Sequence, residues 1–271
     1  NADEIRRGLR RADMHHVEFH LDAPGLLLRL LDVAAAFGVV SVHNLPLVEA
    51  LHRDLRWVAT RGEAAAVNAA DGYGRSRDGL GCAVTSTGTG AGNAAGSLIE
   101  ALAAGAPLLH VTGQIDSAHL GLGRGFIHET RDQLGLLTAC SSWAATIGDD
   151  PVADFDRARS RLRAPLTGPV SLEWPIDRQY EAATGVLASG GDLASSPEPD
   201  DEGIEHALAL LAEAERPVVW AGGGAIRCGP ELDAFLDRLG AGLITSNAGR
   251  GALPESDPRV VGNFASAACG A

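Results

Sequence analysis

A glycine-rich turn between an apolar strand and an alanine-rich helix constrains the fold of this chain most. The run Gly81–Thr85 predicts a short buried strand, and the turn Ser86–Asn93 opens a helix that ends near Gly105. A second apolar run, Leu108–Thr112, follows directly after Pro107. A strand, a turn, a helix and another strand in this order are typical of a parallel sheet covered by helices. We therefore expect an α/β fold built on a doubly wound parallel sheet.

Two helices and two strands are expected upstream of this turn. The apolar spacing of Leu26–Phe37 predicts a helix that Gly38 ends. The β-branched run Val39–Val42 predicts the first strand. Asn44 is expected to cap the second helix, with Pro46 near its start. The second of these strands is predicted over residues 55–59.

Glu63 follows that second strand closely. Ligands of doubly wound sheets bind outside the carboxyl ends of the strands, which places Glu63 beside the expected crevice. Glu63 also begins a helix of small residues, where the helix dipole favours a carboxylate whatever its function. From the residues alone, a ligand-binding role and a purely helix-stabilising role for Glu63 are equally supported.

The composition predicts four segments along the chain. Residues 1–24 form an N-terminal arm, residues 25–181 the first α/β domain and residues 182–203 a linker rich in Gly, Ser, Pro and Asp. Residues 204–271 begin a second, Rossmann-like domain, with a helix over Ile204–Glu213 and a buried strand over Pro217–Ala221. The arm holds His15, His16 and His20. His16 and His20 are four residues apart and could share one helix face, but no third ligand is well placed beside them, so no metal site is predicted.

Charge and cysteine usage exclude several classes of partner. The 271 residues carry a net charge of −13 without a basic stripe, which argues against nucleic acid and anionic membranes as partners. The four cysteines are scattered, as in proteins of a reducing compartment. There is no run long enough to span a bilayer and no signal peptide in the sequence. We therefore expect a cytoplasmic protein.

Two glycine-rich turns raise the alternative of a dinucleotide-binding oxidoreductase. Gly88–Asn93 follows a strand and opens a helix, but Asn93 stands where the Gly-x-Gly-x-x-Gly fingerprint requires its last glycine. Gly222–Gly224 leads into a Gly-x-x-x-x-Gly step that continues with Pro230 and Glu231 in place of Lys and Ser or Thr. Close strand–helix packing explains both turns better than a dinucleotide, although NAD(P) or FAD at either turn stays an alternative.

Several short motifs, in one order and with natural spacings, resemble a known family. They are Arg61–Glu63, Ala69–Arg75, Ser86–Asn93, Thr112–Gln114, Phe126–Glu129, Asp132–Gln133, Gly168–Val170 and Trp174–Asp177. Together they resemble the pyrimidine-binding domain of thiamine-diphosphate enzymes, the group of acetolactate synthase and benzoylformate decarboxylase. The resemblance extends from about Leu26 to the end of the chain, where the second domain resembles part of the family's central domain.

The resemblance implies a role for individual residues. In this family a buried glutamate binds the aminopyrimidine ring and assists deprotonation of the thiazolium; Glu63 matches it. His128 matches a residue that approaches the substrate, so Glu63 and His128 are the implied catalytic residues. The implied cofactor-binding residues are Glu63, Thr87, Gly88, Asn93 and Gln114. The chain departs from the family pattern at Gly62, at Val40–Ser41 and at Ser142.

The resemblance also implies an activity, cofactors and an assembly. It implies a lyase or transferase that decarboxylates or ligates a 2-oxo acid, with thiamine diphosphate and Mg²⁺, and with FAD or no nucleotide in the central domain. It further implies a homodimer or homotetramer. The family's diphosphate and magnesium site belongs to a C-terminal domain whose Gly-Asp-Gly motif is absent from this sequence. We therefore expect either a fragment or a chain completed by a partner, inactive alone; a degenerate, non-catalytic regulatory subunit is the further alternative.

Overall fold

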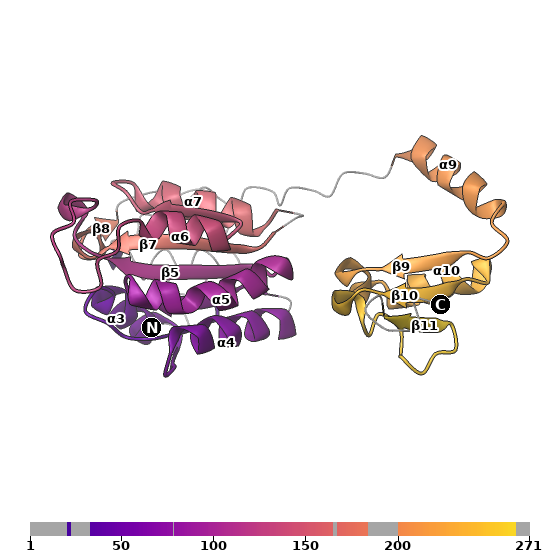
Figure 1. The fold of residues 1–271 in the computed structure, drawn as a ribbon, viewed down its shortest axis with the longest axis horizontal. Helices are drawn as coiled ribbons and strands as arrows, with labels where there is room; N and C mark the ends of the chain where they lie inside the picture. The colour runs from indigo at the N-terminus through magenta and orange to yellow at the C-terminus, as the bar shows by residue number, and fades with distance from the viewer. Residues whose placement is uncertain (1–20, 23–32, 78, 165–166, 184–199, 264–271) are drawn as a thin grey trace. The chain divides into compact units, whose positions relative to one another are not determined.

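The computed structural model describes residues 21–22, 33–77, 79–164, 167–183 and 200–263. The chain separates into two compact units, residues 1–196 and residues 197–271 (Figure 1). His15, His16 and His20 of the expected arm lie outside the described residues.

A six-stranded parallel sheet forms the centre of the first unit. Its strands are β2 (Ala35–Gly38), β3 (Arg56–Ala59), β4 (Gly81–Thr85), β5 (Leu108–Gln114), β6 (Trp143–Thr146) and β7 (Pro169–Pro175). Their order in the sheet is β3-β2-β4-β5-β7-β6, and every pair is parallel. The chain winds outward from β2 to β3, then returns and winds the other way from β4. The predicted doubly wound α/β fold is confirmed, and its switch point lies between β2 and β4.

Helices cover the sheet through two separate cores. The helices are α3 (Leu45–Asp54), α4 (Glu63–Ser76), α5 (Thr89–Ala103), α6 (Gln133–Cys140), α7 (Pro151–Leu162) and the short α8 (Ile176–Gln179). Side chains of α3 and α7 share one core, in which Phe155 packs on Trp174 with ring centroids 5.5 Å apart. The other core lies under α4, α5 and α6, which lie side by side (Figure 1). Small residues such as Ala70 and Ala94 let these helices lie close to the sheet.

The predicted start of the fold is wrong in two respects. Ala35–Phe37 belong to strand β2 and not to a helix, so Gly38 does not end a helix but closes the strand. A Cβ on Gly38 would lie 2.3 Å from the Val84 carbonyl oxygen, so the pairing of β2 with β4 requires glycine there. The expected strand Val39–Val42 is instead the turn between β2 and α3. A short apolar run fits the side-chain spacing of a helix and that of a strand equally well. Here the pairing of residues 35–38 with β3 and β4 makes the run a strand.

A short antiparallel pair closes the first unit. Strand β1 (Leu21–Asp22) pairs with β8 (Ala182–Ala183). β8 therefore includes the first two residues of the expected linker, and residues 184–199 lie outside the described residues.

The second unit is a smaller parallel sheet with its own core. Its elements are α9 (Asp201–Ala212), β9 (Val218–Ala221), the 3₁₀ turn η2 (Gly223–Arg227), α10 (Gly229–Leu239), β10 (Gly242–Thr245), η3 (Asn247–Gly249) and β11 (Val260–Asn263). The strand order is β11-β10-β9. Leu232 and Leu236 of α10 pack with Leu243 in one core, whereas α9 has no buried residue. The sheet and α10 agree with the predicted part of a Rossmann-like domain, but the strand predicted to be buried, β9, is buried only at Ala221.

No helix in the described part of the chain is both long enough and apolar enough to cross a membrane.

Candidate active site

The turns after β2 and β4 are tied together at the switch point of the sheet. Asn44, at the start of α3, does not cap that helix as expected. Its amide nitrogen donates instead to the carbonyls of Val39 and Thr85, each at 3.0 Å, and its amide oxygen accepts from the Ser41 N–H at 2.8 Å. Asn44 therefore fixes the turn after β2 to the carboxyl end of β4, where a doubly wound sheet opens its ligand crevice.

Glu63 lies against the first turns of helix α5. It begins α4 and is 9% exposed, and its Oε2 accepts a hydrogen bond of 3.2 Å from the Asn93 amide. A Cβ on Gly90 would lie 2.9 Å from Glu63 Oε1, so glycine at 90 makes room for the carboxylate. The structure thus brings together Glu63 and Asn93, two of the residues that the sequence predicts to bind the cofactor.

The turn that opens α5 requires glycine at position 88. Gly88 has φ +57° and ψ −94°, and a Cβ there would lie 1.8 Å from the His128 carbonyl oxygen. Its N–H donates to Gln133 Oε1 at 2.6 Å. Beside it, Thr87 is fully buried, and no described residue hydrogen-bonds its hydroxyl. The turn therefore holds a buried hydroxyl that the described part of the chain leaves without a hydrogen bond.

His128 lies in the loop that covers this turn. It is the only non-glycine residue with positive φ, +64°, in the described ranges. Its Nδ1 lies 3.1 Å from the hydroxyl of Thr89, the first residue of α5, and the residue is exposed. The irregular segment after β5 therefore returns to the helix on which Glu63 rests. Backbone strain held in this way is common where a loop serves a ligand.

Gln114 takes part in a neighbouring network rather than in the Glu63 cluster. It is 7% exposed at the end of β5, its Nε2 donates to Glu173 at 3.0 Å, and its Oε1 accepts from the Ile115 N–H at 2.9 Å. Both ends of this amide are therefore engaged within the protein.

Sequence reasoning missed His43 and Glu173. His43 follows β2 at the switch point, is 8% exposed, and its Nδ1 is buried without a hydrogen bond from any described residue. Burial, and then the charge of His128, lower the pKa of His43, and Asp116 partly opposes them. His43 could have been noticed as the residue directly after the expected strand Val39–Val42, since ligands bind at the carboxyl ends of strands. Glu173 could have been noticed as a carboxylate inside the apolar run 169–175.

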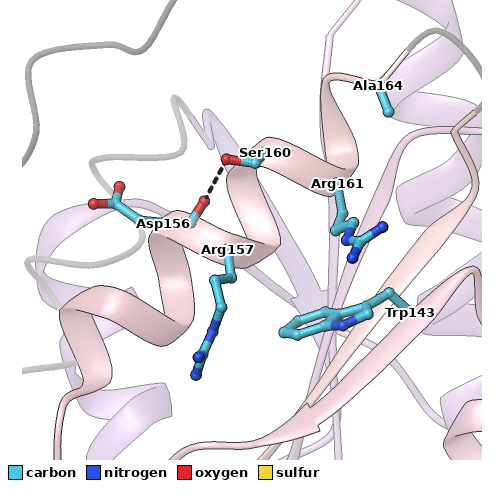
Figure 2. Close-up of a pocket in the computed structure, with 6 residues that line it drawn as sticks. All are labelled: Trp143, Asp156, Arg157, Ser160, Arg161 and Ala164. Carbon is cyan, nitrogen blue, oxygen red and sulfur yellow. Dashed lines mark hydrogen bonds between the residues drawn. The ribbon is translucent and has the colours of Figure 1, made fainter. Parts of the chain in front are cut away.

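One cavity on the first unit, of about 520 Å³, is lined by α7 and by Trp143, with Arg157 and Arg161 beside the indole ring (Figure 2). Trp143 begins β6, so this cavity lies toward the amino ends of the strands, away from the expected ligand crevice. The second, of about 320 Å³, is lined by residues at the carboxyl ends of β5, β6 and β7, Gln114 and Glu173 among them. The described residues include no group of three or more His, Cys, Asp or Glu able to hold a metal ion.

Alanine at position 88 is expected to destabilise the first unit by about 1–3 kcal/mol, because a side chain meets both the unfavourable backbone angles and the His128 carbonyl. The matched change Gly72→Ala lies inside α4, where a Cβ meets nothing within 4 Å, and it should stabilise the helix by about 0.5–1 kcal/mol. Urea unfolding of both variants measures the two effects. Equal stability of the two variants would contradict the assigned role of the turn.

Comparison with known proteins identifies the class to which this fold and site belong. The N-terminal TPP-binding domain of the thiamine pyrophosphate enzymes matches residues 26–136, and the central domain of the same enzymes matches residues 204–270. The chain belongs to the family of thiamine-diphosphate-dependent (thiamine-pyrophosphate-dependent) enzymes.

Individual relatives are similar over most of this chain. It is 36% identical over 257 residues to a protein of Pseudomonas aeruginosa assigned as the 2-ketoarginine decarboxylase AruI, covering 88% of this chain and 44% of that protein. It is 28% identical to the acetolactate synthase large subunit of Haemophilus influenzae, covering 87% of this chain and 42% of the relative. The chain thus spans less than half the length of these relatives.

Solved structures show the same fold. A Mycobacterium smegmatis protein assigned to the thiamin diphosphate-dependent enzymes superposes with a TM-score of 0.79 at 25% identity, covering 90% of this chain and 48% of that one. The 4-hydroxybenzoylformate decarboxylase of Rhodococcus jostii superposes with a TM-score of 0.76 at 22% identity, covering 89% of this chain and 47% of that one. The predicted family and fold class are therefore confirmed.

Proposed function

We propose that this chain binds the aminopyrimidine of thiamine diphosphate through Glu63, as part of a 2-oxo acid decarboxylase or carboligase similar to acetolactate synthase. The observation that carries this proposal is the position of Glu63 beside the switch point of the sheet, hydrogen-bonded to Asn93 on the turns that open α5. Family membership supports this cofactor over the alternative of a dinucleotide.

The residues around Glu63 fit an aminopyrimidine. The Thr87 hydroxyl is buried beside Gly88, and no described residue hydrogen-bonds it, so an unused polar group lies at the turn next to Glu63. Gly90 leaves the Glu63 carboxylate open to a flat ring because a side chain there would press on it. Thiamine diphosphate, accompanied by Mg²⁺, supplies the electron sink that decarboxylation of a 2-oxo acid requires.

Each residue of this chain then has a separate task. Glu63 holds or releases a proton at the pyrimidine nitrogen, and Asn93 orients that carboxylate through its amide. His128, exposed in the loop over α5, faces the 2-oxo acid. Gln114 supports the site from the end of β5 through its bond to Glu173.

Calorimetric titration of the complete enzyme tests this function. Saturable binding of thiamine diphosphate with Mg²⁺, and none of NAD, is the expected result; FAD in a third titration tests the second unit for a nucleotide. The proposal fails if NAD binds and thiamine diphosphate does not.

We place the enzyme in the cytoplasm because its cysteines are unpaired where they are described, at Cys82, Cys140 and Cys228.

A dimer or a dimer of dimers is the proposed assembly, with α4 and α5 at the two-fold axis. These helices contact each other and expose small residues; a Cβ on Gly96 meets nothing within 4 Å, and Ile99 beside it is 52% exposed. A self-complementary surface of this kind lets two copies approach closely.

The assembly is tested by Gly96→Leu. Leucine is a better helix former than glycine, so the fold should persist, but its side chain should block close approach of a second copy. Light scattering at tens of micromolar should give a dimeric mass for the wild type and a shift toward monomer for the variant. A monomeric wild type would rule out this assembly.

A further inference from the structure

Glu173 is a buried carboxylate that accepts three side-chain hydrogen bonds. It lies on β7 and is 3% exposed. Its Oε2 accepts from Gln114 Nε2 and Gln133 Nε2, both at 3.0 Å, and its Oε1 accepts from the Thr146 hydroxyl at 2.6 Å. No ion pair involves Glu173 within the described ranges. Burying such a group is costly unless its hydrogen bonds are made, and these donors come from β5, α6 and β6.

Gln133 connects this carboxylate to the turn that opens α5. The residue is 3% exposed at the first position of α6. Its Nε2 donates to Glu173 and to the Gly113 carbonyl, at 3.0 and 3.1 Å, and its Oε1 accepts the Gly88 N–H at 2.6 Å. An amide has one donating and one accepting end, so the end that faces Glu173 decides which end faces Gly88.

From this arrangement we infer that Glu173 is a positioning residue, which orients the Gln133 amide and thereby holds the Gly88 turn in the shape that receives the aminopyrimidine. A carboxylate only accepts hydrogen bonds, so it draws the NH₂ group of Gln133 toward itself and leaves the oxygen for Gly88. The Gly88 N–H, engaged in this way, holds the backbone of the turn against α6. We call the hydrogen bonds from Glu173 through Gln133 to Gly88 the relay. The role of the turn in cofactor binding rests on the proposed function, whereas the relay does not.

The two variants of Glu173 that separate the relay from simple packing are Glu173→Met and Glu173→Gln. Methionine has a similar size and offers no strong acceptor, so the Gln133 NH₂ group keeps only one of its two acceptors, the Gly113 carbonyl. Glutamine can place its oxygen where Oε2 lies and turn its NH₂ to the Thr146 hydroxyl, which is able to accept. The relay is therefore lost in the first variant and restored in the second.

Amide hydrogen exchange at Gly88, followed by NMR on the full chain, is the readout. We expect about tenfold faster exchange or more in Glu173→Met, and exchange close to wild type in Glu173→Gln. The control is Asp154→Met: Asp154 is a 4% exposed carboxylate on α7 that accepts from the Gly148 N–H at 2.8 Å and pairs with Arg157. This control should lower stability without changing exchange at Gly88. Unchanged Gly88 exchange in folded Glu173→Met would overturn the relay.

A wild-type measurement covers the case in which Glu173→Met does not fold. Scalar couplings across the hydrogen bonds should join Gly88 N to the side-chain carbonyl carbon of Gln133, and Gln133 Nε2 to the carboxyl carbon of Glu173. Absence of either coupling overturns the inference.

Thiamine-diphosphate titration of the complete enzyme separates the two proposals. Failure of the wild type to bind would end the proposed function and leave the relay, whereas unchanged affinity in Glu173→Met would end the role of the relay in cofactor binding.

Discussion

Replacing Glu63 by glutamine is expected to reduce turnover of the complete enzyme about 10²–10⁴-fold, which is the usual contribution of general acid–base catalysis. The amide keeps the size of the carboxylate and can still hydrogen-bond both Asn93 and the pyrimidine, so cofactor affinity should change little. It cannot take up or release the proton at the pyrimidine nitrogen. Turnover and C2-proton exchange of bound thiamine diphosphate should therefore fall together.

A purely structural Glu63 predicts a different pattern. As a carboxylate in the first turn of α4 it would contribute only about 0.3–1 kcal/mol of stability through the helix dipole, and turnover of the folded variant would be nearly intact. Thermal unfolding measured on the same variant separates the two patterns. Glu100→Gln, an exposed carboxylate near the other end of α5, is the matched control and should leave exchange unchanged. Normal C2-proton exchange in Glu63→Gln would exclude the catalytic role.

The part of the fold that the sequence predicted best is the part whose geometry is set locally. The strand over Gly81–Thr85 has the predicted bounds, and the turn after it needs Gly88 for its positive φ and its contact with His128. Gly90 is needed because Glu63 lies against it. Glycine at such positions is visible in a sequence, so this turn and the clustering of Glu63 with Asn93 could be anticipated.

The first strand could not be predicted because its conformation depends on distant partners. Ala35 and Ala36 are fully buried between β3 and β4, and their small apolar side chains suit a helix equally well. Asn44 precedes α3 as a capping residue would, yet its amide joins carbonyls on either side of the switch point. In both cases tertiary contacts overrode a local preference.

The polar network behind the turn was beyond sequence reasoning for the same reason. Gln114 and Glu173 are 59 residues apart, and Gln133 and Glu173 are 40 apart. They meet only because β5 and β7 are neighbours in the sheet although α6, β6 and α7 separate them in the chain. The order of strands, and not the pattern within any one of them, creates this network.

Acid is expected to destabilise the first unit through His110, a fully buried residue of the central strand β5. Its two ring nitrogens lie 2.9 Å from the Thr85 hydroxyl and 3.0 Å from the Ser171 hydroxyl. Burial lowers the pKa of His110 from 6.5 to about 3. The fold therefore favours the neutral ring, while the unfolded chain takes up a proton near pH 6.5. This stabilisation is complete above pH 6.5 and falls by about 1.4 kcal/mol per pH unit toward pH 3, roughly 4–5 kcal/mol in all.

Comparison with His110→Gln isolates this contribution, because His43 and the carboxylates also titrate as the pH falls. Glutamine can still reach Thr85 and Ser171 but carries no titrating group. Urea unfolding from pH 7 to 4.5 should show the free energy of unfolding falling more steeply for the wild type, by about 1.4 kcal/mol per pH unit. Parallel curves would show that His110 does not titrate between the two states. Where the variant does not fold, the ring carbon resonances of wild-type His110 give the same answer, since a neutral buried ring keeps constant shifts from pH 8 to 4.5.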